Sequence, residues 1–224
     1  MSSLLLPLVF VSAMAQGAII DRIAATVDDE AITESDVRKA IATSPLRPAP
    51  DESPEAFRGR VLDALIDQRL SYADALRFGP AAPDPAAVEE ALAKLKTRLK
   101  SEGKDPEKEF AAAGLTPEEV RASVERQLLI QRYLQERFRP VAFADDARAR
   151  EEYEKVYVPE VRGANGTPEP FEKVEEEMRR RAQQRTFEEE VEKWMKELRE
   201  KARIVIYKAP ASIPPRTPTP IGKK

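Results

Sequence analysis

The segment RIAATVDDEAITESDV, residues 22–37, decides the fold of this chain. Apolar side chains recur at every second position of 23–27, which predicts a half-buried β-strand. The acidic run 28–30 interrupts this strand, and Asp tolerates the backbone conformations that a tight turn requires. A brief return of apolar residues then leads into a helix, since Thr33 is a favoured N-cap residue and Asp36 completes a capping box. The strand residues expected to face inward are Ile23, Ala25 and Val27.

This opening hairpin needs further partners, because two isolated strands are only marginally stable in water. One other stretch has strand character, the segment RIVIY at 203–207. We therefore predict that the two ends of the chain pair with each other. The predicted fold is mainly α: a multi-helix body closed by a small β element that joins the N-terminal hairpin to the C-terminal strand.

Helix start and stop signals divide the intervening chain. Ser, Asp or Thr followed by Pro opens several helices, and Gly or Pro ends them. The expected helices cover approximately 33–43, 53–78, 84–102, 105–114, 116–138, 145–157 and 171–202. A Pro- and Gly-rich loop is expected over 159–170. The apolar stripe of the last helix fades at 182–186, which predicts a kink or an exposed stretch there.

The composition excludes several classes of protein. The chain has 37 basic and 40 acidic residues, so its net charge of -3 gives no electrostatic basis for nucleic-acid binding. It contains no Cys and no His, which removes thiol nucleophiles, disulfides and the commonest zinc ligands and general base. The nucleotide-binding motifs GxxxxGK[ST] and GxGxxG are also missing from the sequence. We expect no cofactor, no metal and no catalytic residues.

The two ends of the chain carry targeting and tail signals. Residues 1–15 contain a short apolar run followed by Ala13-Met14-Ala15, a pattern typical of a signal peptide and its cleavage site. The alternative is a buried N-terminal segment. Residues 209–224 are Pro-rich and basic, which is typical of a disordered tail. The mature folded unit is expected over 19–208, with no integral membrane span.

The exported start, the entry segment and the final ARIVIY resemble the SurA-type periplasmic chaperones and their relatives, the parvulin-containing foldases. The residues that carry this resemblance are Ile32, Thr33, Ser35, Asp36 and Val37. It implies an N-terminal strand pair, several helices, and a long helix and strand that return to the first strand. The family turn often includes Gly, whereas this chain has Glu30, so the turn type is open.

One departure from the family concerns the parvulin isomerase domain, which needs on the order of a hundred residues. Only one helix and a loop are expected between Pro140 and Phe171, and the parvulin active site uses histidines, of which this chain has none. The resemblance therefore implies the chaperone core of the family without its isomerase. We predict that the chain is not an enzyme.

The predicted function is an ATP-independent periplasmic chaperone that holds unfolded or partly folded exported polypeptides, including outer-membrane proteins, by reversible apolar contacts. The alternatives are a helical adaptor that binds one folded partner and, less favoured, a peptidyl-prolyl isomerase. For several of the candidate client-binding residues, the alternative role is to pack the helices against one another. The candidates are Leu92, Leu95, Leu99, Phe138, Phe143, Met178, Trp194 and Met195.

Overall fold

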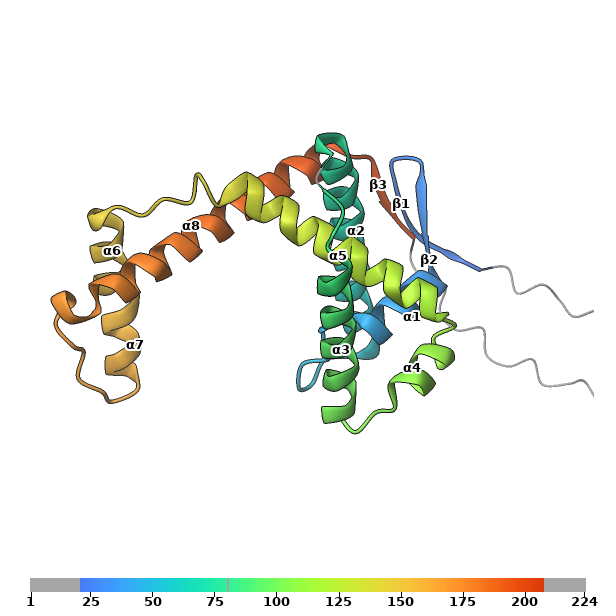
Figure 1. Cartoon of the computed structure of the whole chain (residues 1–224), viewed down its shortest axis with the longest axis horizontal. Coiled ribbons are helices and arrows are strands. Elements are labelled where there is room, and N and C mark those ends of the chain that lie inside the picture. Colours follow the sequence, from blue (N-terminus) through green and yellow to red (C-terminus); the bar gives the residue numbers. More distant parts are fainter. Residues whose placement is uncertain (1–20, 80, 208–224) are drawn as a thin grey trace, which may run out of the picture.

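The computed structural model describes residues 21–79 and 81–207 of the chain. Within these ranges the protein is mainly helical, with a small three-stranded sheet (Figure 1). The predicted fold class is confirmed. The predicted signal peptide at 1–15 and the predicted tail at 209–224 lie outside the described residues. No helix among the described residues has the length and apolar character needed to cross a membrane.

The elements follow the order expected from the sequence. The strands are β1 (Ile23–Val27), β2 (Glu30–Thr33) and β3 (Ile204–Ile206). The helices of the first two thirds of the chain are α1 (Glu34–Thr43), α2 (Pro54–Phe78), α3 (Pro85–Ser101), α4 (Pro106–Ala112) and α5 (Pro117–Phe138). The remaining elements are α6 (Asp146–Glu152), the π-helical turn η1 (Tyr153–Tyr157), α7 (Val158–Gly163) and α8 (Phe171–Lys201).

The sheet joins the two ends of the described chain. Its strand order is β2-β1-β3, and both neighbours of β1 are antiparallel to it. In register, Val27 lies opposite Glu30 on one side and Ile204 on the other. The predicted pairing of the N-terminal and C-terminal strands is therefore confirmed.

Two details of the hairpin differ from the prediction. The register shifts between Ile23 and Ala25, and this irregularity buries both Ala24 and Ala25 while Ile23 is 43% exposed. The strict alternation was wrong at this point because a bulge places two successive residues on the same side of the strand. Glu30 belongs to β2, so the turn is shorter than the acidic run suggested.

Asp28 connects this turn to the C-terminal strand. It has a positive φ of 52°, a conformation that Asp adopts more readily than most residues. Its amide donates to the carbonyl oxygen of Arg203 at 2.9 Å, and its carboxylate accepts from the Arg203 amide, also at 2.9 Å. The turn therefore fixes the point at which β3 enters the sheet.

The helix starts agree closely with the sequence signals. Capping boxes are present at Thr33 with Asp36 and at Thr116 with Glu119. Ser53 caps α2, whose first residue is Pro54. These signals are local, since each N-cap side chain satisfies an amide only two or three residues away.

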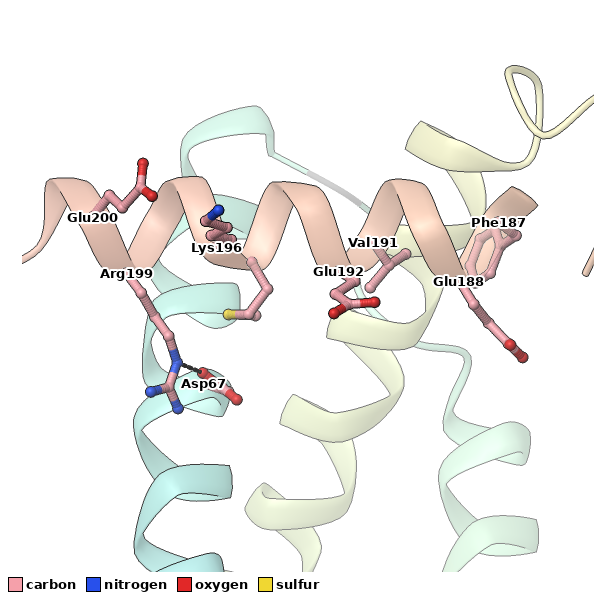
Figure 2. Close-up of a pocket in the computed structure, with 9 residues that line it drawn as sticks. Asp67, Phe187, Glu188, Val191, Glu192, Lys196, Arg199 and Glu200 are labelled. Carbon is pink, nitrogen blue, oxygen red and sulfur yellow. Dashed lines mark hydrogen bonds and ion pairs between the residues drawn. The ribbon is translucent and has the colours of Figure 1, made fainter. Parts of the chain in front are cut away.

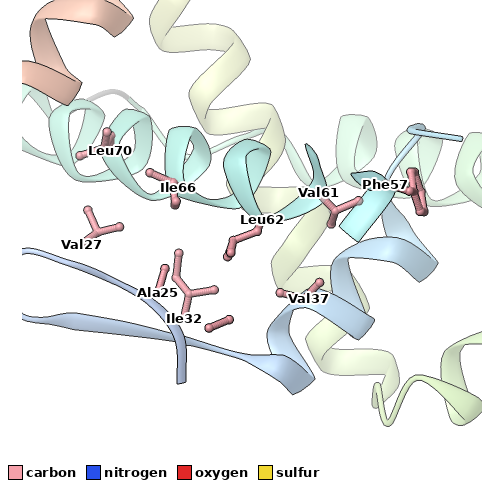
Figure 3. Close-up of a cluster of buried hydrophobic side chains, with 10 residues drawn as sticks. Ala25, Val27, Ile32, Val37, Phe57, Val61, Leu62, Ile66 and Leu70 are labelled. Atoms are coloured by element: carbon pink, nitrogen blue, oxygen red, sulfur yellow. The ribbon is translucent and has the colours of Figure 1, made fainter. Parts of the chain in front are cut away.

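The main core lies between the sheet and α2 (Figure 3). Ile32 from the sheet and Ile66 from α2 are fully buried, and Val37 brings α1 against them. Figure 3 shows the side chains of α2 directed toward β1 and β2 along much of the helix. The sheet is thus covered on one face by the longest helix of the N-terminal region.

Figure 1 shows two parts joined by α8. We call the sheet with α1–α5 and residues 187–201 the body, and α6, η1 and α7 with residues 171–186 the small lobe. A linker at 139–145 also connects the two parts. The long helix α8 spans approximately 46 Å from the small lobe to the body.

The loop predicted over 159–170 was wrong in its first half. Residues 158–163 form α7, and Pro159 lies in its first turn. Before it, the amide of Val158 donates to the carbonyl oxygen of Tyr153, an i to i−5 bond typical of a π turn. Because the ring of Pro clashes with the carbonyl four residues earlier in an α-helix, this wider turn lets the helical path continue past Pro159.

Ile32→Ala should lower the free energy of unfolding by about 2–5 kcal/mol, because Ile32 is fully buried between the sheet and α2. Urea denaturation followed by circular dichroism measures the change. The matched control is Ile23→Ala in the same sheet, which should cost less than about 1 kcal/mol because Ile23 is 43% exposed. Equal losses in the two variants would contradict the described core.

Candidate functional site

The C-terminal half of α8 is attached to the body through Asp74 of α2. The carboxylate oxygen Oδ2 of Asp74 accepts from the Tyr133 hydroxyl at 2.7 Å and from the Trp194 indole Nε1 at 3.1 Å. It also lies 3.3 Å from Nη1 of Arg137. Asp74 is only 9% exposed, so these contacts join α2, α5 and α8 at a buried polar centre.

Aromatic rings surround this centre. Trp194 packs against Phe138 and Tyr133 at centroid distances of 5.5 and 6.0 Å. The guanidinium of Arg137 lies 5.2 Å from the Phe78 ring centroid and 5.9 Å from that of Trp194, within reach of cation–π attraction. Burial, helped by the hydrogen bond to Asp74, raises the pKa of Tyr133 from 10.0 to about 12. We call Asp74 and the five residues around it the joint; these five are Phe78, Tyr133, Arg137, Phe138 and Trp194.

A groove runs along α8 beside the joint (Figure 2). Its cavity volume is approximately 760 Å³. The apolar lining comes from Phe187, Val191 and Met195, all partly buried and packed against the joint. Their spacing of four residues places them on one stripe of the helix. The residues of the joint therefore pack against the inner side of this stripe, and the outer side of the stripe stays partly exposed in the groove.

Charged side chains surround the apolar lining. Nε of Arg199 donates to Oδ1 of Asp67 at 2.5 Å, which closes one end of the groove against α2. Figure 2 shows Glu188 and Glu192 extending from α8 to the same side as Arg199, whereas Glu200 extends to the opposite side. The combination of an apolar stripe and a charged rim is suited to contact with an amphipathic polypeptide segment.

A second, smaller hollow lies between α3, α4 and α5. Its cavity volume is approximately 390 Å³, and Leu92 contributes to its lining. Leu95 and Leu99, predicted with Leu92 as client-binding residues, are 9% and 1% exposed. They pack with Phe110 and Val120 in a core that attaches α4 to α3 and α5. Of the three leucines, only Leu92 is partly exposed in this conformation.

The other predicted residues divide in the same way. Phe138 and Trp194 are buried in the joint, and Met178 is fully buried in the small lobe with Ala149. Phe143 in the linker is 70% exposed. Met195 lines the groove. The role of all eight residues in client binding stays a prediction, but the exposed surface belongs to Leu92, Phe143 and Met195.

The groove also contains residues that the sequence prediction did not assign to a site. Phe187 and Val191 have the same helical spacing as Met195, a signal that could have identified them. Asp67 and Arg199 lie 132 positions apart in the sequence, and no local pattern links them.

The small lobe is held on α8 by its own contacts. Arg185 contacts both oxygens of Glu152, with Nε–Oε2 at 2.8 Å and Nη2–Oε1 at 3.1 Å. Glu152 is 5% exposed. The hydroxyl of Thr186 accepts from Nη1 of Arg148 at 3.1 Å. The stretch 182–186, where a kink or an exposed stretch was predicted, lies within the continuous helix α8, with Ala182 and Thr186 buried and Gln184 and Arg185 exposed.

Similarity to known proteins is found in the fold and not in the sequence. No family model and no curated protein matches the sequence. A solved structure from the study of PEB4 and the periplasmic protein Cj1289, two structurally related SurA-like chaperones of Campylobacter jejuni, matches with a TM-score of 0.53 and 14% sequence identity. The match covers 84% of this chain and 100% of that chain. The chain has a SurA-like fold. Among residues 21–79 and 81–207, no group of three potential metal ligands occurs.

The raised pKa of Tyr133 predicts a specific loss of stability at high pH. Because the folded state holds the Tyr133 proton more tightly than the unfolded state, the stabilisation is complete below pH 10.0 and is lost as the pH rises to about 12. Urea midpoints measured across this range should fall more steeply for the wild type than for Tyr133→Phe. Parallel profiles would contradict the buried hydroxyl.

Arg185→Ala should release the small lobe locally. It leaves the buried Glu152 carboxylate without its partner, at a cost of about 1–3 kcal/mol. Hydrogen exchange in α6 should become about 10 to 100 times faster, with the body unchanged. Arg180→Ala is the control, since Arg180 is exposed and has no ion pair within the described residues. Unchanged protection of α6 in Arg185→Ala would refute the role of this ion pair.

Proposed function

We propose that the protein is an ATP-independent periplasmic chaperone that holds unfolded exported polypeptides. The observation that carries the proposal is the groove on α8, because it leaves an apolar stripe partly exposed in a molecule with a SurA-like fold. The structural neighbour is described as belonging to a pair of SurA-like chaperones, one of them periplasmic. The predicted signal peptide supports the same compartment.

The proposed action is binding without chemical change. Unfolded chains expose apolar side chains and aggregate, and a surface that covers these side chains lowers the concentration of aggregating species. An apolar contact of about 400 Å² contributes roughly 10 kcal/mol before the costs of ordering. These costs offset most of that contribution, so binding is weak and release needs no nucleotide. The charged outer faces of the helices keep the complex in solution.

The arrangement of α8 suits this task. The body and the small lobe lie at opposite ends of the helix (Figure 1). The groove residues of α8, from Phe187 to Glu200, belong to the body end. A polypeptide segment bound along α8 would therefore contact partly exposed Phe187 and Val191 at one end and the ion pair of Arg199 at the other. Contacts at several points along one helix accept varied sequences, because none of them depends on a fixed hydrogen-bond pattern.

Holding activity can be measured by diluting an unfolded outer-membrane barrel protein into the purified mature chain and recording light scattering. The wild type should suppress aggregation near a one-to-one ratio without ATP. The Phe187→Ser, Val191→Ser double variant should need about tenfold more protein, because truncating anchor side chains of an interface commonly costs more than 1 kcal/mol.

The matched control is the Ile23→Ser, Ile41→Ser double variant, which removes apolar side chains that are 43% and 38% exposed and do not line the groove. It should protect clients as the wild type does, and urea denaturation confirms that both variants are folded. If the folded wild type leaves aggregation unchanged, the holding function is refuted. Retention of one folded partner in its place would favour the adaptor alternative.

A further inference from the structure

We propose that the groove on α8 selects polypeptide segments in which basic residues flank an apolar core. This inference rests on the proposed holding function and adds the chemical class of segment that the groove prefers. It is based on the balance of charge around the apolar lining, not on the net charge of the whole chain.

The rim of the groove carries an excess of negative charge that the protein itself does not neutralise. Four of the lining residues are acidic and two are basic. Arg199 is already matched, since it pairs with Asp67 at 2.5 Å and lies 3.8 Å from Asp63. The remaining charged residues of the lining have no ion pair within the part of the chain that the structure describes: Glu188, Glu192, Glu200 and Lys196.

The positions of these charges matter as much as their number. Glu188 and Glu192 extend from α8 to the same side as Arg199 (Figure 2), and Met195 lines the same groove. Their carboxylates therefore border the apolar lining directly. The amide of Gln184 donates to Glu188 at 2.7 Å but supplies no charge. A segment whose apolar side chains cover Val191 thus brings its flanking residues next to two carboxylates.

The length of the groove fixes the scale of such a segment. Its lining extends along α8 from Phe187 to Glu200, which corresponds to approximately 20 Å of helix. An extended chain of about six residues covers this distance. A basic residue at the Phe187 end of a short apolar core then falls within a Debye length of the Glu188 and Glu192 carboxylates at physiological salt, about 8 Å. An acidic residue at the same position meets repulsion.

The test uses two fluorescent peptides with the same Leu-, Phe- and Val-containing core, one flanked by Lys and the other by Glu. Fluorescence anisotropy with the full mature chain should give an affinity at least about fivefold higher for the Lys-flanked peptide at low salt, about 0.01 M. The preference should shrink toward equality at about 1 M salt. Charge reversal in Glu188→Lys, Glu192→Lys should invert it.

A second test neutralises the two rim carboxylates in the double variant Glu188→Gln, Glu192→Gln. Its control is the double variant Glu154→Gln, Glu172→Gln. Both variants remove two exposed carboxylates that have no ion pair within the described residues, but only Glu188 and Glu192 border the groove. The Glu188, Glu192 pair should lose the preference, and the Glu154, Glu172 pair should keep it. Loss of the preference in both pairs would attribute it to overall charge and overturn the inference.

The remaining outcomes separate this inference from the proposed function. Equal binding of both peptides by the wild type overturns the charge preference and leaves holding intact. Binding of neither peptide overturns both. The chain's own residues 208–224 are a further candidate occupant, with four basic and no acidic side chains. If the Lys-flanked peptide binds only after those four are changed to Ser, the groove serves the tail and the assignment to clients is overturned.

Discussion

The attachment of α8 to the body depends on the Asp74 carboxylate. One oxygen accepts from the Trp194 indole and from the Tyr133 hydroxyl, and thereby holds three helices together in a buried setting. A carboxylate without partners would be strongly disfavoured there, so the position of each donor is fixed by the need to satisfy it. The aromatic rings around Arg137 complete the packing. This centre supports the apolar stripe of α8 from the body, together with the packing of Met195 and Leu198 against the main core.

The rest of the molecule follows from α8 being held at both ends by different means. At the body end its attachment is aromatic and its continuation β3 pairs with β1. At the other end the small lobe is packed around Met178 and is fastened by the ion pair of Glu152 with Arg185. Between these attachments the helix is continuous, and its apolar stripe is partly exposed along the groove.

The fold could be predicted from the sequence to the extent that its signals are local. Capping by Thr33 and Thr116 involves residues three positions apart, and both helix starts were predicted correctly. The errors occurred where one residue type permits two outcomes. Pro159 ends a helix in many contexts, yet here a π turn precedes it and the helical path continues. Ile23 fits an alternating strand, but the bulge that exposes it has no signature in the sequence.

The candidate site was less predictable because burial is decided by tertiary packing. Periodicity identifies Trp194 and Met195 as neighbours on an apolar stripe but cannot tell which of them faces the body; the structure buries Trp194 at 5% exposure and leaves Met195 in the groove. The ion pair of Asp67 with Arg199 is equally invisible, since it joins helices that are distant in sequence. These long-range contacts turn an ordinary amphipathic helix into a groove. They compensate the charge of Arg199, and the negative rim that results is a property of the folded molecule, which no count of charges along the sequence reveals.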